Sequence, residues 1–136
     1  MGSSTSLLTM VGRAIGRRCP RCGSGSVFKG WFDLVDHCPR CGHRFEREQG
    51  YWVGAMIINT AFAIVGLMGG FLLGLALTWP AVPWEALTIG TAVVAGLIPL
   101  VGYPYSKTLW LAYDLKVHPL EPAEEEAARQ RTRLAP

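Results

Sequence analysis

The sequence predicts an α-helical membrane hairpin, made of two transmembrane helices, with a small N-terminal β head. Two observations lead to this prediction. Four cysteines form two copies of the pentapeptide CPRCG, at residues 19–23 and 38–42. The segment from Glu48 to Ser106 contains no lysine or arginine, and Glu85 is the only charged residue between residues 49 and 106. A soluble fold would distribute charges through such a segment to keep its surface hydrated.

Each CPRCG copy has the features of a metal-binding knuckle. Cysteines three residues apart can direct both sulfurs at one ion, the proline favours a turn, and the glycine can adopt positive φ. Two knuckles at this spacing are typical of a closed four-thiolate zinc site. We therefore predict a zinc-ribbon-like head in which one Zn²⁺ is held by Cys19, Cys22, Cys38 and Cys41.

Other uses of the four cysteines are weighed against structural zinc. Iron suits the same four-sulfur site but is the less favoured metal. Two disulfides would need an oxidising compartment, and a redox-active Cys-x-x-Cys normally belongs to a thioredoxin-like fold, which this sequence does not indicate. His37 and His43 flank the second knuckle, and we expect them to face solvent or to support the ligands from outside.

The segment between the knuckles, VFKGWFDLV at residues 27–35, has the aromatic and β-branched composition of short strands. So few apolar residues cannot form a self-sufficient core. Metal binding would therefore supply the folding energy of the head.

Two apolar segments follow, at residues 50–79 and 83–104. About 20 helical residues cross the ~30 Å hydrocarbon layer of a membrane, and the first segment has 28 consecutive uncharged residues from Gly50 to Leu77. Tyr51, Trp52 and Trp79 lie where interfacial aromatic residues are expected. Prolines at 99 and 104 should weaken or bend the second helix as it leaves the membrane.

Small residues recur within both spans and indicate close helix packing. The first span has a glycine every fourth residue, and the second has one small pair. The packing could occur within the hairpin or between two copies, and the simpler alternative is that membrane helices are rich in glycine. Asn59, in the first span, should seek a polar partner. The candidate packing residues are Gly66, Gly70, Gly74, Ala92 and Gly96.

The rest of the chain divides into four further segments. Residues 1–18 form a basic segment that contains a short amphipathic helix, residues 19–47 form the head, residues 105–118 form a juxtamembrane helix, and residues 119–136 form a charged tail expected to be a frayed helix or disordered. Eight basic residues precede the spans, five follow them, and the turn between them has none. Both termini are therefore predicted to be cytoplasmic, in a multi-pass protein.

The sequence from Arg18 to Pro122 resembles DUF983, a family of small bacterial membrane proteins. The resemblance rests on CPRCGSGSVFKGWFDLVDHCPRCG, on a glycine-led aromatic entry to the first span, and on the exit YPYSKTLWLAYDLKVHPLEP. It implies two spans in the bacterial cytoplasmic membrane, a zinc-ribbon-like head and no assigned activity. Some family members are encoded near cytochrome oxidase assembly genes. This chain departs from the family at residues 46–51, where an acidic glycine-containing stretch is replaced.

We expect a non-enzymatic membrane adaptor or assembly factor, because no nucleophile–base set, phosphate loop or intramembrane carboxylate pair is present in the sequence. Its partners would be the bilayer and a membrane protein or a second copy of the chain. The alternative is a factor that handles metal or thiols for a membrane complex, such as a respiratory oxidase. A nucleic-acid partner is not expected, because Asp33 and Asp36 offset the basic residues of the head.

Overall fold

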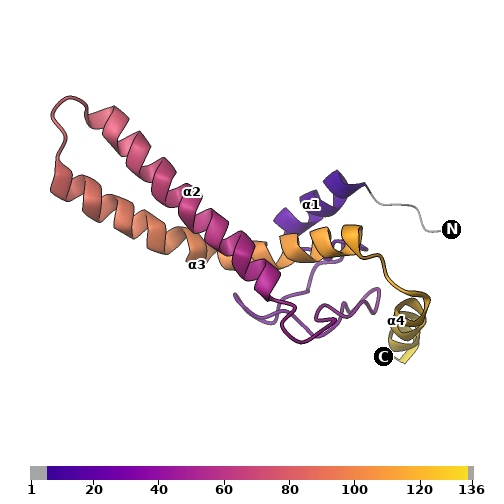
Figure 1. The fold of residues 1–136 in the computed structure, drawn as a ribbon. Helices are drawn as coiled ribbons and strands as arrows, with labels where there is room; N and C mark the ends of the chain where they lie inside the picture. Colours follow the sequence, from indigo (N-terminus) through magenta and orange to yellow (C-terminus); the bar gives the residue numbers. More distant parts are fainter. Residues whose placement is uncertain (1–5, 135–136) are drawn as a thin grey trace.

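The computed structural model describes residues 6–134 of the 136-residue chain. Residues 1–5 and 135–136, at the ends of the predicted N-terminal segment and tail, lie outside this range. Figure 1 shows an elongated hairpin of two long helices, with the remaining elements gathered at its open end. The helices are α1 (Leu7–Ile15), α2 (Val53–Thr78), α3 (Trp84–Val117) and α4 (Pro122–Leu134).

Helices α2 and α3 are long and apolar enough to cross a membrane. Helix α2 has 26 residues, so it is about 39 Å long, which exceeds the ~30 Å hydrocarbon layer. Large apolar side chains remain exposed along both helices, including Ile57, Leu73 and Val93. This exposed surface is typical of helices that face an apolar environment rather than water.

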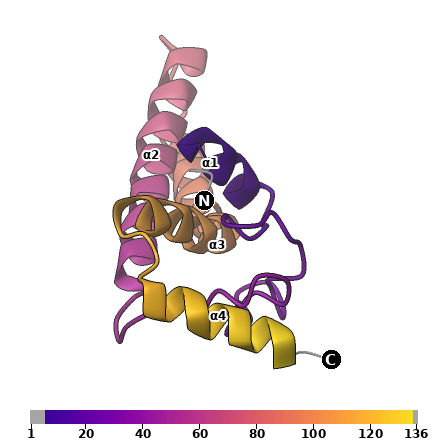
Figure 2. The same ribbon diagram turned by 90° about the vertical axis from the view of Figure 1, so that its right-hand side faces the viewer.

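Helix α3 is continuous over 34 residues. It joins the predicted second span and the predicted juxtamembrane helix into one element, although Pro99 and Pro104 both lie inside it. A proline removes one backbone hydrogen bond and crowds the preceding turn, which bends a helix without always ending it. Figures 1 and 2 show that the last turns of α3 run in a different direction from the part that lies beside α2.

The two long helices pack against each other within the chain. A Cβ atom added at Gly66 would meet the side chain of Ile98, and one added at Gly74 would meet Leu87. Gly70 lies in a wider part of the contact, where an added Cβ would be 3.5 Å from the Val94 side chain. The glycine stripe of α2 therefore faces bulky side chains of α3, which fill the space that the glycines leave.

The small pair on α3 lies elsewhere. Ala92 and Gly96 are exposed, and an added Cβ at Gly96 would meet nothing within 4 Å. The structure thus does not bring these two residues to the glycine stripe. Asn59 lies near Gly102, and its Oδ1 atom is buried with no hydrogen-bond partner among the described residues.

The predicted β character of the head is not confirmed, because no strand forms between residues 6 and 134. The head contains two isolated antiparallel bridges, Phe28–Leu34 and His37–Arg44. Flanking hydrogen bonds, such as the 2.9 Å bond from the Val35 amide to the Val27 carbonyl, extend the pairing only slightly. The knuckles occupy the neighbouring backbone with their own hydrogen bonds, so few residues remain for a ladder.

The charged tail, expected to be frayed or disordered, forms helix α4 in the structure. It is held against the head by the ion pairs Arg21–Glu125 (3.2 Å) and Arg47–Glu124, and by the burial of Ala128. These contacts span more than 70 residues of sequence, so the local composition of the tail carries no sign of them.

The basic segment at the start of the chain forms helix α1, as the apolar pattern indicated. Met10 and Ala14 are its buried residues, and they pack beside Ala112 of α3. Leu7 and Ile15, two other apolar residues of the helix, remain exposed.

The hairpin packing yields a prediction for Gly66→Leu. Its side chain would collide with Ile98, so the variant should lose about 1–3 kcal/mol of stability, the usual cost of overpacking. Gly69→Leu is the matched control, because an added Cβ at Gly69 meets nothing within 4 Å. Thermal unfolding in detergent measures both variants, and equal stability would contradict the observed packing.

Candidate metal centre

The two knuckles have the same backbone geometry. In each, the amide of the first cysteine donates to the carbonyl five residues later, and the glycine amide donates back to the carbonyl of the first cysteine. Both glycines have positive φ, +75° at Gly23 and +65° at Gly42, as the pentapeptide predicted. The bonds are Cys19 N–Ser24 O at 2.9 Å, Gly23 N–Cys19 O at 2.8 Å, Cys38 N–His43 O at 2.8 Å and Gly42 N–Cys38 O at 2.9 Å.

The repeated geometry brings the four cysteine sulfurs together. All four Sγ atoms lie within 4.8 Å of one another. The Cys19–Cys41 and Cys22–Cys38 sulfurs are 3.9 Å and 3.6 Å apart, so each close pair joins one cysteine from each knuckle. All four are free thiols; Cys19 and Cys38 are buried, and the other two are partly exposed. The arrangement can hold one metal ion.

The crowding of these thiols has an electrostatic consequence. The pKa of the Cys19 thiol is raised by its hydrogen bonds with Cys38 and Cys41 and by burial. The hydrogen bond with Cys19 lowers the pKa of Cys38. Four adjacent thiolates would repel one another, so full ionisation of the cluster requires a cation at its centre.

Each knuckle is contacted by an arginine from a terminal helix. Arg13 of α1 donates to the carbonyls of Pro20 and Arg21, at 3.1 and 2.8 Å. Arg131 of α4 donates to the carbonyl of Gly42 at 3.1 Å. These bonds satisfy backbone carbonyls of the knuckles, so both terminal helices help to fix the cysteine backbone.

The two histidines beside the second knuckle differ in environment. His37 is exposed, whereas His43 is buried and packs edge-on against Phe45, with 5.8 Å between ring centroids. Burial, with the nearby charges of Arg21 and Arg47, lowers the pKa of His43 to about 4. The His43 ring is therefore neutral at physiological pH, and its place is in the packing around the knuckle.

The cysteine cluster shares its core with helix α3. Leu111 is completely buried in one apolar cluster with Cys19, Val27, Cys38 and Phe45. Four of these five residues come from the head, and Leu111 is the only one from the hairpin. The last turns of α3 thus pack directly against the cysteine cluster.

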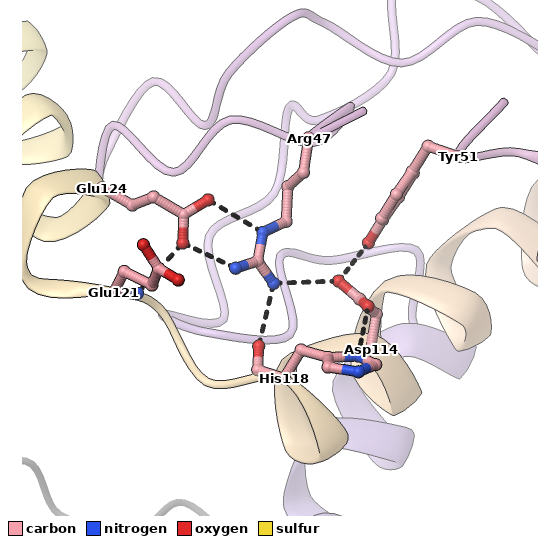
Figure 3. A network of polar contacts seen from close by, with 6 residues as sticks. All are labelled: Arg47, Tyr51, Asp114, His118, Glu121 and Glu124. Carbon is pink, nitrogen blue, oxygen red and sulfur yellow. Dashed lines mark hydrogen bonds and ion pairs between the residues drawn. The ribbon is translucent and has the colours of Figure 1, made fainter. Parts of the chain in front are cut away.

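A polar network around Arg47 joins the head, α3 and α4 (Figure 3). The Arg47 side chain is only 14% exposed, and it binds Glu124 through two of its nitrogens. Its third nitrogen donates to Asp114, 10% exposed, at 3.1 Å and to the His118 carbonyl at 2.8 Å. Tyr51 donates to the same Asp114 oxygen at 2.8 Å. The bond to Arg47 lowers the pKa of the Glu124 carboxyl, so Glu124 stays ionised beside the guanidinium.

Lys107 forms a second link between α3 and the head. It is buried, and its Nζ donates to the Phe32 carbonyl at 2.7 Å. The ammonium also lies 5.0 Å from the Trp52 ring and 4.9 Å from the Tyr103 ring, within cation–π range. A charge in this place is stabilised by one carbonyl and two aromatic faces.

The roles of Arg47, Lys107 and Asp114 as structural links were not predicted from the sequence. One signal was present: Lys107 and Asp114 are seven residues apart and share a helical face, and Leu111 lies between them. The sequence predicted a juxtamembrane helix at residues 105–118 and named no partner for this face. The face meets the head, because the charges find partners in segments distant in sequence.

The fold and the site define a class of protein: a helical hairpin, long and apolar enough to cross a membrane, that carries a head with four clustered cysteines. The chain belongs to the family described as "Protein of unknown function (DUF983)", which matches residues 28–114. The resemblance found in the sequence is thereby confirmed, over a range that includes the second knuckle and begins after Cys22. No curated protein and no solved structure matches the chain.

The knuckle geometry yields a prediction for Gly42→Ala and Gly23→Ala. Both variants place a Cβ at positive φ, which costs roughly 1–2 kcal/mol. At Gly42 the Cβ would also collide with the Ala128 backbone of α4, whereas at Gly23 it meets the flexible Arg13 side chain. Gly42→Ala should therefore be the more destabilising variant, and it should speed hydrogen exchange in α4. Equal exchange in the two variants would show that α4 does not pack on the knuckle.

Proposed function

We propose that this protein is a non-enzymatic membrane adaptor or assembly factor with a structural zinc site in a cytoplasmic head. The observation that carries the proposal is the closed cluster of four sulfurs, fixed by α1, α4 and the last turns of α3. A closed set of four protein ligands leaves no coordination position for a substrate. Such a site stabilises a surface rather than catalysing a reaction.

The sulfur distances fit one tetrahedral metal ion. A tetrahedral site with metal–sulfur bonds of about 2.3 Å has sulfur–sulfur edges of about 3.8 Å. The two close pairs, at 3.6 and 3.9 Å, bracket this value. Iron forms a site of the same shape, and we propose zinc because closed four-thiolate sites in small ribbon-like heads most often have a structural role.

The exposed apolar helices support a membrane anchor. Tyr51 and Trp52 lie at the head end of the hairpin, and Trp79 and Trp84 lie exposed at its turn, so aromatic residues mark both ends. Basic residues gather at the head end only. Under the positive-inside rule the head and α4 face the cytoplasm of a bacterial inner membrane.

The partner we propose is a membrane protein or a second copy of the chain. Gly66 and Gly74 already pack against α3, so the glycine stripe is largely used within the hairpin. Exposed apolar faces of α2 and α3 remain available within the bilayer. The head would then present its charged surface to a cytoplasmic part of the partner.

A second candidate function has one observation in its favour. Cys22 and Cys41 are only partly buried, so one cysteine of each knuckle lies nearer the surface than the other. A factor that handles metal or thiols for a membrane complex would need cysteines near the surface. In that case the head would exchange its ion rather than keep it.

A metal challenge separates the two functions. The adaptor should contain one zinc per chain and keep it against a chelator, because metal binding of about 10–16 kcal/mol supplies the folding energy of the head. Elemental analysis and chelator competition on the detergent-purified protein measure both quantities. Rapid loss of zinc from a head that stays folded would favour the handling function. Cys38→Ser should abolish metal binding and unfold the head while the hairpin stays helical.

The proposed topology predicts a labelling pattern in intact cells. A cysteine placed at Ala81, in the turn between α2 and α3, should react with a membrane-impermeant thiol reagent. A cysteine placed at Glu126, on the exposed side of α4, should react only after the cells are opened. The reverse pattern would contradict a cytoplasmic head, and reaction at both sites in intact cells would contradict a spanning hairpin.

A further inference from the structure

Two exposed apolar patches lie at the head end of the hairpin, one on the head and one on α1. The first is the aromatic tip, Trp31 and Phe32, in the loop between the bridge partners Phe28 and Leu34. Trp31 is 47% exposed and Phe32 is 41% exposed. A head with so small a core gains nothing for its folding from two aromatic side chains held in water.

The second patch is the outer face of α1, formed by Leu7, Leu8 and Ile15. Leu8 is 83% exposed and Ile15 is 59% exposed, whereas Met10 and Ala14, on the neighbouring face, are buried against α3. The apolar surface of α1 is therefore wider than the surface that α3 covers. A helix with this pattern and nearby arginines is typical of one that lies in a membrane interface.

Both patches lie near the level at which the hairpin meets the head. The Phe32 ring contacts the Tyr103 ring at 5.7 Å, close to the end of the predicted second span. The Ala14 carbonyl of α1 accepts a hydrogen bond from Thr108, one turn further along α3. In Figure 1 the loop before α2 reaches back to the level at which α2 begins, α1 lies beside the last turns of α3, and α4 is the element farthest from the hairpin.

The charge around the two patches is mainly basic. Residues 6–36 contain five basic residues and two acidic residues, Asp33 and Asp36, and Asp36 pairs with Lys29 at 3.9 Å. The Arg17 guanidinium stacks on the Phe28 and Trp31 rings, with centroid distances of 4.4 and 4.7 Å. Basic groups beside exposed aromatic and aliphatic side chains suit a bilayer surface that contains anionic lipids.

We infer that the aromatic tip and the outer face of α1 form a second membrane-contact surface, which inserts into the headgroup layer of an anionic leaflet on the head side of the hairpin. The inference rests on the membrane anchor proposed above. Lipid is the occupant that fits, because both patches lie beside the emerging hairpin and the basic residues around them outnumber the acidic ones by five to two. The head is then held against the bilayer, and α4 is the face turned to the cytoplasm.

Fluorine NMR of the full chain in anionic nanodiscs tests this inference. The five tryptophans are replaced with 5-fluorotryptophan, and the Trp31 signal is assigned by its absence in Trp31→Phe. A lipid with a nitroxide near its headgroup should abolish the Trp31 signal, together with those of Trp79 and Trp84 at the turn. A water-soluble paramagnetic chelate should leave the Trp31 signal largely intact.

The outcomes separate the inference from the anchor on which it rests. A Trp31 signal that is lost with the soluble chelate, while Trp79 and Trp84 are lost with the labelled lipid, would overturn the inference and leave the anchor standing. If no tryptophan signal responds to the labelled lipid, the anchor itself fails. In discs that contain the labelled lipid but no anionic lipid, the Trp31 signal should return and the Trp84 signal should stay lost. If the Trp31 signal is lost in these discs as well, anionic lipid is not needed for the contact.

A matched pair of variants tests α1 by the same measurement. Leu8 on α1 and Leu134 on α4 are 83% and 84% exposed, so either accepts a tryptophan without disturbing the packing. The fluorine signal added by Leu8→Trp should be lost with the labelled lipid, and the signal added by Leu134→Trp should be lost only with the soluble chelate. The same response at both positions would contradict the orientation of the head.

Discussion

The structure depends on the last turns of α3, which supply the core that the head does not have. The head contains too few apolar residues to form a core of its own. Leu111 of α3 completes the apolar cluster that contains the buried cysteines of the head. Lys107 and Asp114, on the same face, reach the Phe32 carbonyl and Arg47. One helical surface therefore provides an apolar contact, a cation and an anion to the head. The hairpin and the head are parts of one structure for this reason.

The polar contacts of Asp114 and Arg47 fix the position of α3 relative to the head and α4. Breaking a buried ion pair by removing one partner is costly, commonly about 3–5 kcal/mol, because the remaining charge is left without compensation. Asp114 is held by both Arg47 and Tyr51, and Arg47 also binds Glu124 at the start of α4. A displacement of α3 would therefore disturb α4 as well as the head, since both depend on the same guanidinium (Figure 3).

Local signals in the sequence predicted the parts of the structure that local physics determines. The repeated pentapeptide predicted the cysteine cluster and the positive φ of Gly23 and Gly42, because each knuckle is complete within a few residues. The uncharged segments predicted the two long helices. The β head was not confirmed, since knuckle hydrogen bonds leave little backbone free for pairing. The order of α4 and the burial of Lys107 could not be predicted, because both depend on partners more than 70 residues away.

The order of synthesis determines when the cysteine cluster can be completed, because Leu111 of α3, which packs against the cluster, comes late in the chain. A ribosome makes the four cysteines first, then the hairpin, and only afterwards Leu111, Asp114 and Arg131. During elongation the four cysteines are therefore present before the α3 surface against which they pack. Completion of the head therefore waits until the second long helix has been synthesised and has packed against it.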